Sequence, residues 1–366
     1  MSSRTARVVS FSYSSKTFYA EFHPNFPLSR QASRIKKSFA ESDGASVEIY
    51  SDPLHDVKID YDGALTIFSD LPTGNFLPEY CYGVDANIIN FPGGVKDFLA
   101  GMSYFGEIDN AVVCLPGGGY NLHHFVLEIL PAILLFRDEV KAADSLVLGA
   151  TPGASFLQEF NEIFDLNENL KLVPLNASLQ LRRSTNISAF PFRIYPIDLI
   201  NEIRVEVTRH FPVLTSIESE ILFIGRRDFD RNRRALTNEE QVIDLLRQSF
   251  GKVSLIRPGV SQLSQTVGAI QRARILVGPT GGNLAHLIWA KNLEIFIEIV
   301  PDGYFGDTET EELSKIFGFK YLRVSSKSLP NQEWNYSDQA CNLAEFQAML
   351  KQNFSGLKLR ISPELI

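Results

Sequence analysis

The second half of the chain alternates between two hydrophobic patterns. Short runs of β-branched and aromatic residues, beginning with EILFIG at Glu220, predict buried strands, and the segments between them carry apolar residues at helical spacing, as in NEEQVIDLLRQSF. Further strand patterns are KVSLIRP, ILVGP, EIFIEIV and KYLRVS, and further helix patterns are SQLSQTVGAIQRA, GGNLAHLIWA and TEELSKIF. Alternation of this kind forms right-handed βαβ units. We therefore predict a Rossmann-like domain with a parallel sheet covered on both faces over residues 211–366.

The first half of the chain is less regular. It begins with irregular polar sequence and continues with the strand patterns SVEIY, ALTIF, NIINF, NAVVCLP, SLVLGA and KLVPL. One long helix pattern starts near Tyr120, and another runs from Ala154 to Ile163. We therefore predict a second, looser α/β domain over residues 1–210, also Rossmann-like, which faces the other domain across a cleft. Residues 197–212 would connect the two domains, and the last helical pattern, NLAEFQAMLKQNF, is a candidate to pack back on the first domain.

Composition and charge narrow the classes of function. The 366 residues are 45% hydrophobic and 21% charged, which is typical of a globular protein and long enough for two domains. The formal net charge of −8 argues against nucleic acid as a partner, because neutralising phosphates needs an excess of Lys and Arg. Three widely spaced cysteines fit neither a disulfide framework nor a cysteine-based zinc site, and they favour a reducing compartment.

The apolar segments predict no transmembrane helix. The N-terminal arginines are not followed by the apolar run of a secretory signal. The most apolar stretch, residues 125–136, is too short to span about 30 Å of hydrocarbon. We expect a cytoplasmic protein, and peripheral association with a membrane is compatible with this sequence.

Polar residues follow three strands of the second domain at one edge of the predicted sheet. Five arginines follow EILFIG, the turn PTGGN follows ILVG, and a glutamate lies near the end of EIFIEI. Ligands bind at this edge in open parallel sheets. Arginine matches phosphate oxygens, a glycine turn exposes N–H groups to an anion, and an acidic residue at a strand end accepts hydrogen bonds from ribose. The pattern favours a nucleotide diphosphate site formed by Arg226, Arg227, Arg231, Arg233, Arg234, Thr280, Gly281, Gly282, Asn283 and Glu298.

Other interpretations of this edge stay open. The arginines can pair on the surface with Asp228 and Asp230, and the glycine turn can serve only close packing of a helix on a strand. The two aspartates could also bind Mg²⁺ or Mn²⁺, although the surrounding arginines oppose a cation.

A second group of polar residues opens the helix after NAVVCLP. In LPGGGYNLHHFVLEILP, three glycines lead into a helix whose first turns carry Asn121, His124 and Glu128. His124 and Glu128 are four residues apart and share one face of the helix. A carboxylate fixes the tautomer of a neighbouring imidazole and raises its basicity, so the pair suits a general base. The alternative is a buried structural pair, and His123, about 100° away around the helix, is expected to be structural.

These segments resemble glycosyltransferase family 61, and in particular its bacterial capsular-polysaccharide type. NLHHFVLEILP is similar to the family's Asn-x-x-His-aromatic-x-x-Asp/Glu-x-x-Pro element, and IGRRDFDRNRRALTNEEQV to its arginine-rich/Asn-Glu element. ILVGPTGGNLAHLIWAKNLEIFIEIV resembles the Gly-Pro-His-Gly-Ala-Gly-Leu element and the following strand, except that the histidine is Thr280 and Ala-Gly is Gly282-Asn283. The matching positions are Asn121, His124, Glu128, Arg226, Arg227, Arg233, Arg234, Asn238, Glu239, Gly278, Pro279, Gly281, Leu284 and Glu298.

The resemblance implies a GT-B architecture and an inverting glycosyltransferase. A hexosyl or pentosyl group would move from a nucleotide sugar, with a UDP-sugar favoured, to a hydroxyl of a glycan or lipid-linked glycan. No metal or other cofactor is expected, because arginines would stabilise the leaving diphosphate. The implied catalytic residues are His124, Glu128 and Asn121, and the implied donor-binding residues are Arg226, Arg227, Arg233, Arg234, Thr280, Gly281, Gly282, Asn283 and Glu298.

Three other functions compete with this one. A non-enzymatic nucleotide-sugar or glycan-binding protein of the same fold stays open. An α/β-hydrolase needs a Gly-x-Ser-x-Gly elbow, and the nearest pentapeptide, GATPG at residues 149–153, has no serine. A dinucleotide oxidoreductase is disfavoured because neither strand–turn–helix carries Gly-x-Gly-x-x-Gly.

Overall fold

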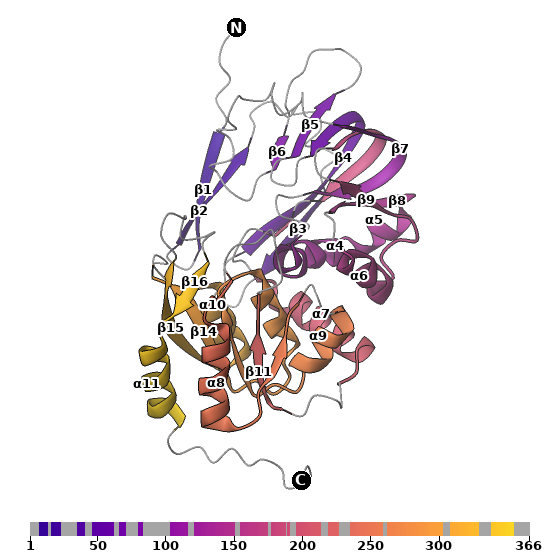
Figure 1. The fold of residues 1–366 in the computed structure, drawn as a ribbon. Helices are drawn as coiled ribbons and strands as arrows, with labels where there is room; N and C mark the ends of the chain where they lie inside the picture. The colour runs from indigo at the N-terminus through magenta and orange to yellow at the C-terminus, as the bar shows by residue number, and fades with distance from the viewer. Residues whose placement is uncertain are drawn as a thin grey trace. The chain divides into compact units, whose positions relative to one another are not determined.

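The computed structural model of the chain divides into two compact units, Met1–Ile203 and Arg204–Ile366 (Figure 1). The division falls inside the helix α7 (Ile197–His210), within the segment expected to connect two domains. The structure describes residues 103–115, 121–150, 154–174, 177–187, 189–190, 195–213, 219–226, 235–258, 262–302, 308–328 and 338–354, and, by their backbone alone, six strands before residue 83.

The first unit contains an eight-stranded mixed sheet in the order β6-β5-β4-β10-β7-β8-β9, with β3 also pairing with β4. The strands β10, β7, β8 and β9 are parallel, and β3 to β6 extend the sheet in antiparallel fashion. The Rossmann-like prediction for this domain therefore holds for its parallel part alone. The strands are β3 (Ile35–Ala40), β4 (Ser46–Tyr61), β5 (Thr66–Asp70), β6 (Tyr80–Tyr82), β7 (Ser103–Cys114), β8 (Ser145–Ala150), β9 (Leu170–Pro174) and β10 (Ala177–Ile187).

The N-terminal segment, whose sequence pattern was interpreted as irregular, forms two strands. An antiparallel hairpin forms there from β1 (Arg7–Tyr13) and β2 (Lys16–Phe22), whose sequences RVVSFSY and KTFYAEF alternate apolar and polar residues in part. The strand predicted at NIINF lies outside the described residues.

Helices of the first unit follow β7 and β8. The segment after β7 comprises α3 (Leu122–His124), the π-helical turn η2 (Phe125–Ile129), α4 (Leu130–Leu135) and α5 (Arg137–Ala142), and α6 (Phe156–Phe164) follows β8. Phe125 packs edge-on against Phe160 with ring centroids 5.5 Å apart. This contact joins the two helical segments through buried aromatic rings.

The second unit contains a six-stranded sheet in the order β12-β11-β13-β14-β15-β16. The first five strands are parallel, as predicted, and β16 is antiparallel to β15. Because β12 lies on one side of β11 and β13 on the other, the direction of winding reverses between β11 and β13. The strands are β11 (Ile221–Ile224), β12 (Ser254–Ile256), β13 (Ile275–Pro279), β14 (Ile295–Pro301), β15 (Lys320–Ser328) and β16 (Gln339–Cys341).

One face of this sheet packs on α8 (Glu239–Phe250) and α11 (Leu343–Phe354). Within this core, Phe354 of α11 lies edge-on against Phe250 of α8, with ring centroids 4.9 Å apart. On β14 the alternate residues Ile295, Ile297 and Ile299 belong to this core. Glu298 between them must point to the opposite face. The other helical elements are α9 (Leu263–Ile270), the 3₁₀ helix η3 (Gly282–Trp289) and α10 (Glu309–Phe317).

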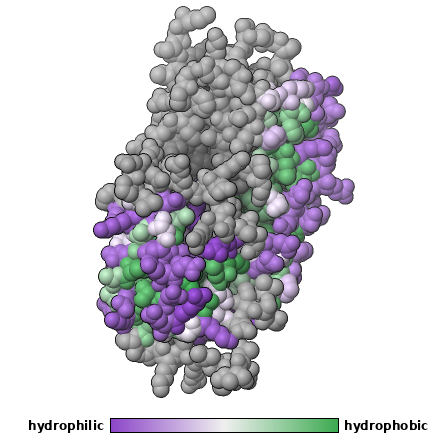
Figure 2. All heavy atoms as spheres, viewed as in Figure 1, coloured by the Kyte–Doolittle hydropathy of each residue, from purple (hydrophilic) through white to green (hydrophobic). Residues whose placement is uncertain are grey.

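In the view of Figure 2, hydrophilic side chains of the described residues surround smaller hydrophobic areas. The large hydrophobic side chains exposed among those residues include Tyr104 and Phe105, which are 66% and 40% exposed. No helix within the described ranges combines the length and hydrophobicity needed to cross a membrane.

Candidate functional site

The reversal of strand order in the second unit brings together two of the segments singled out from the sequence. Gly225 and Arg226 directly follow β11, and Thr280 and Gly281 directly follow β13. The two strands are adjacent and parallel, so both segments leave the same edge of the sheet. Doubly wound sheets of the order 2-1-3-4-5 bind their ligands at this reversal.

Arg226 links the two strand ends. Its guanidinium Nη1 donates a hydrogen bond of 2.7 Å to the Thr280 carbonyl, and only 6% of the residue is exposed. Gly281 has φ = 147°, and a Cβ atom at this position would lie 1.6 Å from the same nitrogen. Glycine is therefore needed here both for its backbone conformation and for the close approach of Arg226.

Thr280 is also held from the strand on its other side. Its N–H and its hydroxyl donate to the Ile299 carbonyl at 2.9 and 3.2 Å. The backbone then enters η3, where the Leu284 N–H donates to the Gly281 carbonyl at 2.9 Å. The Asn283 side-chain nitrogen is buried without a hydrogen-bond partner among the described residues. N–H groups at the start of such a helix favour an anion.

His286, which the sequence reasoning missed, does not take the place of the family's histidine. It lies within η3, 3% exposed, and its Nδ1 accepts a hydrogen bond of 3.0 Å from Trp289 Nε1. Burial lowers the pKa of His286 to about 3, so the imidazole is neutral and serves the packing of this helix.

The residues that follow the arginine-rich segment are held by hydrogen bonds and an ion pair within the second unit. The Asn238 amide exchanges two hydrogen bonds of 2.9 Å with the backbone of Cys341 on β16. Glu239, 2% exposed, pairs with Arg257 at 2.5 Å and lies where a side chain on Gly225 would be. Asn238 and Glu239, carried over from the family resemblance, therefore act as structural anchors.

Several residues expected in this site lie outside the described residues: Arg227, Asp228, Asp230, Arg231, Arg233 and Arg234. In the part of the chain that is described, no group of three or more His, Cys, Asp or Glu side chains could hold a metal ion.

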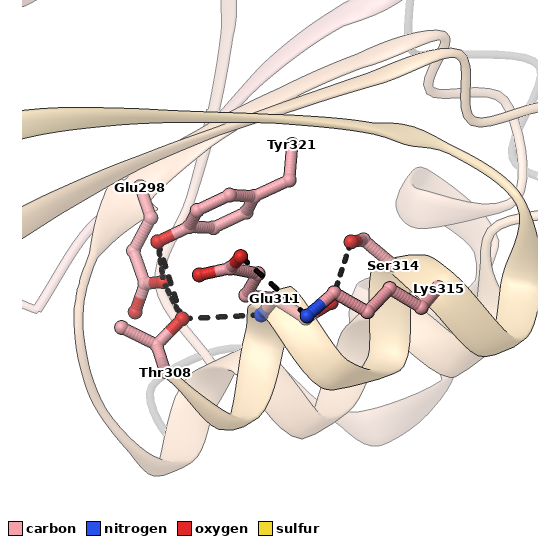
Figure 3. Close-up of polar contacts among 6 residues, drawn as sticks. All are labelled: Glu298, Thr308, Glu311, Ser314, Lys315 and Tyr321. Atoms are coloured by element: carbon pink, nitrogen blue, oxygen red, sulfur yellow. Dashed lines mark hydrogen bonds and ion pairs between the residues drawn. The ribbon is translucent and has the colours of Figure 1, made fainter. Parts of the chain in front are cut away.

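Glu298 lies deeper than the strand end at which it was expected (Figure 3). It is the fourth residue of β14 and is 0% exposed. Its Oε2 accepts hydrogen bonds from the hydroxyls of Thr308 at 2.7 Å and Tyr321 at 2.8 Å. Burial raises the pKa of the Glu298 carboxyl, and its hydrogen bonds offset part of this rise.

The partners of Glu298 were not found from the sequence, although one of them left a signal. Thr308 caps α10 by accepting a hydrogen bond of 3.1 Å from the Glu311 N–H, which corresponds to a Thr-x-x-Glu capping pattern. Tyr321 lies on β15 and carries no comparable motif. Its hydrogen bond to Glu298 depends on the pairing of β15 with β14, so the sequence around Tyr321 could not predict it.

In the first unit, the helix after β7 brings together His124 and Glu128. His124 Nδ1 lies 2.9 Å from Glu128 Oε1, with the histidine side chain 22% exposed and the glutamate side chain 4% exposed. Asn121 is the N-cap, its side-chain oxygen accepting a hydrogen bond of 3.0 Å from the His123 N–H. His123 is 6% exposed, in agreement with its predicted structural position.

The helical segment that carries His124 and Glu128 contains a wide, π-helical turn, for which the sequence offers a local explanation. Pro131 has no N–H to donate to the residue four before it, and its ring would clash with that carbonyl in a regular helix. The π-helical turn Phe125–Ile129 relieves this conflict, and the Glu128 carbonyl accepts a hydrogen bond of 3.0 Å from the Phe190 N–H. Such turns recur at functional sites.

The pair has the arrangement of a general base. With a carboxylate at Nδ1, that nitrogen carries the proton and Nε2 is the basic nitrogen. Glu128 is almost fully buried and His124 reaches the surface, so the carboxylate supports the imidazole from inside. The glycines Gly117 to Gly119 that precede the helix lie outside the described residues.

One family model matches a stretch of the chain that contains both the His124–Glu128 pair and the turn beside Arg226. Residues 122–295 match the model of the family Glycosyltransferase 61. Over this region the chain is glycosyltransferase 61-like. No protein of curated function matches the chain.

The match covers His124, Glu128, Arg226 and the turn after β13. A glycosyltransferase domain acts on a sugar donor and an acceptor. Glu298, Thr308 and Tyr321 lie beyond its last residue.

Replacing Gly281 by alanine is expected to displace Arg226. The new methyl group would overlap Nη1 and would force an unfavourable backbone angle, at a cost of about 1–3 kcal/mol. Urea unfolding measures the loss. Gly251→Ala is the matched control, because Gly251 also has positive φ, at 84°, but a Cβ atom added there would meet no other atom within 4 Å. Equal losses in the two variants would show that the contact with Arg226 is unimportant.

The contribution of Glu298 to stability is expected to decrease as the pH rises above the ordinary pKa of a glutamate. Because the pKa of Glu298 is higher in the folded than in the unfolded protein, its contribution is complete below the unfolded pKa and is lost as pH rises through the folded pKa. The charged groups nearby are Glu309 on α10, which raises the pKa of Glu298, and Arg323 on β15, which acts on Tyr321.

Urea unfolding across pH, compared with Glu298→Gln, measures this contribution. Glutamine keeps the shape of the neutral acid without its proton, so the difference in unfolding free energy between the two proteins should change with pH. A constant difference would contradict a raised pKa.

Proposed function

We propose that the protein is an inverting glycosyltransferase of the GT-B type. It moves a hexosyl or pentosyl group from a nucleotide sugar, a UDP-sugar in the first instance, to a hydroxyl of a glycan or lipid-linked glycan. The observation that carries the proposal is the bond from Arg226 to the Thr280 carbonyl, at the reversal of strand order in a glycosyltransferase 61-like domain.

The second unit binds the donor in this proposal. The diphosphate lies at the start of η3, where N–H groups of Gly281 and Gly282, the Asn283 amide and the charge of Arg226 favour an anion. Arg227, Arg233 and Arg234 add positive charge to the same segment of sequence. Negative charge grows on the leaving diphosphate during transfer, and fixed donors of this kind stabilise it without a metal.

The first unit supplies the acceptor side. His124 Nε2 removes the proton of the acceptor hydroxyl as its oxygen attacks the anomeric carbon, and the carbon–oxygen bond to the diphosphate breaks on the opposite face. Glu128 holds the imidazole in the required tautomer at 2.9 Å, and Asn121 fixes the start of the helix. In this proposal the protein acts in the cytoplasm, in polysaccharide synthesis of the bacterial capsular type.

Removing the Arg226 donors is expected to impair both donor binding and transfer. In Arg226→Met, loss of one such donor should lower kcat about 10²- to 10³-fold. A thermal-shift screen with UDP, GDP, CMP, dTDP and their sugars selects the ligand, since a ligand at about 100 times its Kd stabilises the fold by about 2.7 kcal/mol. Kinetics with that donor, run also in excess EDTA, then measure the variant.

Arg209→Ala is the control for this variant, because the Arg209 side chain is 68% exposed and pairs with Glu206 one turn earlier in α7. A flat response of the wild-type protein to every nucleotide, or unaltered turnover in Arg226→Met, would refute the donor site.

Removing the imidazole of His124 is expected to abolish most transfer while donor affinity is retained. General-base catalysis contributes about 10²- to 10⁴-fold, so His124→Ala should lose that factor in kcat, and Glu128→Gln should lose less. Rapid-mix product assays measure kcat, and calorimetry measures nucleotide binding. His210→Ala removes an exposed histidine as control. Full activity of His124→Ala would exclude it as the base.

A non-enzymatic nucleotide-sugar or glycan-binding protein of the same fold is the second candidate. Thr280 in place of the family's histidine favours it, because the turn lacks an imidazole that the family pattern carries. Nucleotide-sugar binding without transfer or donor hydrolysis across a broad panel of acceptors would establish this second function.

A further inference from the structure

The carboxyl of Glu298 is the meeting point of three elements in the second unit. It projects from β14, and its Oε2 accepts hydrogen bonds from Thr308 at the start of α10 and from Tyr321 on β15. The two hydroxyls are themselves 3.1 Å apart. Figure 3 shows both hydroxyls directed toward the same carboxylate oxygen. A single buried oxygen therefore ties a helix start to two strands.

The same side chain lies beside the turn that follows β13. Gly278 and Glu298 are partners in the register of β13 and β14, and Thr280 bonds to the Ile299 carbonyl, one residue beyond Glu298. The Thr280 hydroxyl also lowers the pKa of the Glu298 carboxyl. Glu298 is therefore packed between the Thr280 turn on one side and Tyr321 and Thr308 on the other.

Direct contact with a nucleotide does not agree with this geometry. A carboxylate that accepts hydrogen bonds from ribose must be open to the ligand, and Glu298 is 0% exposed. Its Oε1 is buried with no hydrogen-bond partner among the described residues, whereas Oε2 already accepts two. Burial of a carboxyl with these partners is typical of a side chain that fixes its neighbours.

We propose that Glu298 is a positioning residue, which holds the Thr280 turn against α10 and β15 through Tyr321 and Thr308 and does not touch the donor. For its effect on donor binding, this inference rests on the proposed function. It gives Thr308 and Tyr321, which were not found from the sequence, a part in the arrangement of Gly281 and Gly282.

The ligand-free test is amide hydrogen exchange of the peptide that covers residues 280–284. Tyr321→Phe and Thr308→Val each remove one hydroxyl donor to Oε2, and one hydrogen bond corresponds to about a 3- to 10-fold change in an opening equilibrium. Exchange in this peptide should accelerate by about that factor. Tyr104→Phe, at an exposed tyrosine of the first unit, is the matched control. Unchanged exchange of the peptide in both network variants would overturn the inference.

The ligand test separates positioning from contact. Calorimetry gives the Kd of UDP and of 2′-deoxy-UDP for the wild type, Tyr321→Phe and Glu298→Gln. Positioning predicts that each variant weakens both ligands by the same factor, about 3- to 10-fold for Tyr321→Phe. A variant at Glu298 that weakens UDP but not 2′-deoxy-UDP would show direct contact with ribose and overturn the inference. A lower melting temperature with unchanged Kd for both ligands would do the same, because the network would then be structural alone.

Failure of the proposed function has a different signature. If no nucleotide binds the wild type, the donor site is refuted, whereas faster exchange at residues 280–284 in the network variants would still support positioning of the turn by Glu298.

Discussion

The hydrogen bond from Arg226 to the Thr280 carbonyl joins the ends of two parallel strands where the winding of the second sheet reverses. Arginine must give up most of its hydration to lie there at 6% exposure, and the Thr280 carbonyl compensates for part of that loss by accepting its N–H. The constraint extends in both directions along the chain. Gly281 has no room for a side chain beside the guanidinium, and Gly225 has none beside Glu239. The glycines of this edge are therefore consequences of how closely its charged groups pack.

Hydrogen bonds of polar groups also hold the opposite side of the turn. Thr280 gives its N–H and its hydroxyl to β14, and Glu298 binds Tyr321 and Thr308. Because the Thr280 hydroxyl already donates its hydrogen to the Ile299 carbonyl, it has none left to donate to a phosphate oxygen. In the family pattern a histidine stands at this position. In this chain the charge at the turn comes instead from Arg226, while His286 is neutral and bonded to Trp289.

The two units use different means to present a charged group at a helix start. In the second unit, the sheet reversal provides the place and a neighbouring strand provides the cation. In the first unit, a single helical segment carries both members of the pair: His124 directly precedes the π-helical turn, and Glu128 lies within it. The first arrangement depends on long-range packing, and the second depends on local sequence.

That difference explains what could be predicted from the sequence. The five parallel strands of the second unit and the His124–Glu128 pair follow from periodicity and from a spacing of four residues, which are local properties of the chain. The central strand β10 was not predicted, because its interleaved polar residues are compatible with a strand only once β4 and β7 pair with it on both sides. The depth of Glu298, its contacts with Thr308 and Tyr321, and the clash that excludes a side chain at Gly281 were decided by tertiary structure alone. Hydrophobic patterning determines which segments form strands and helices, whereas the partners of a buried polar group depend on which segments pack beside it.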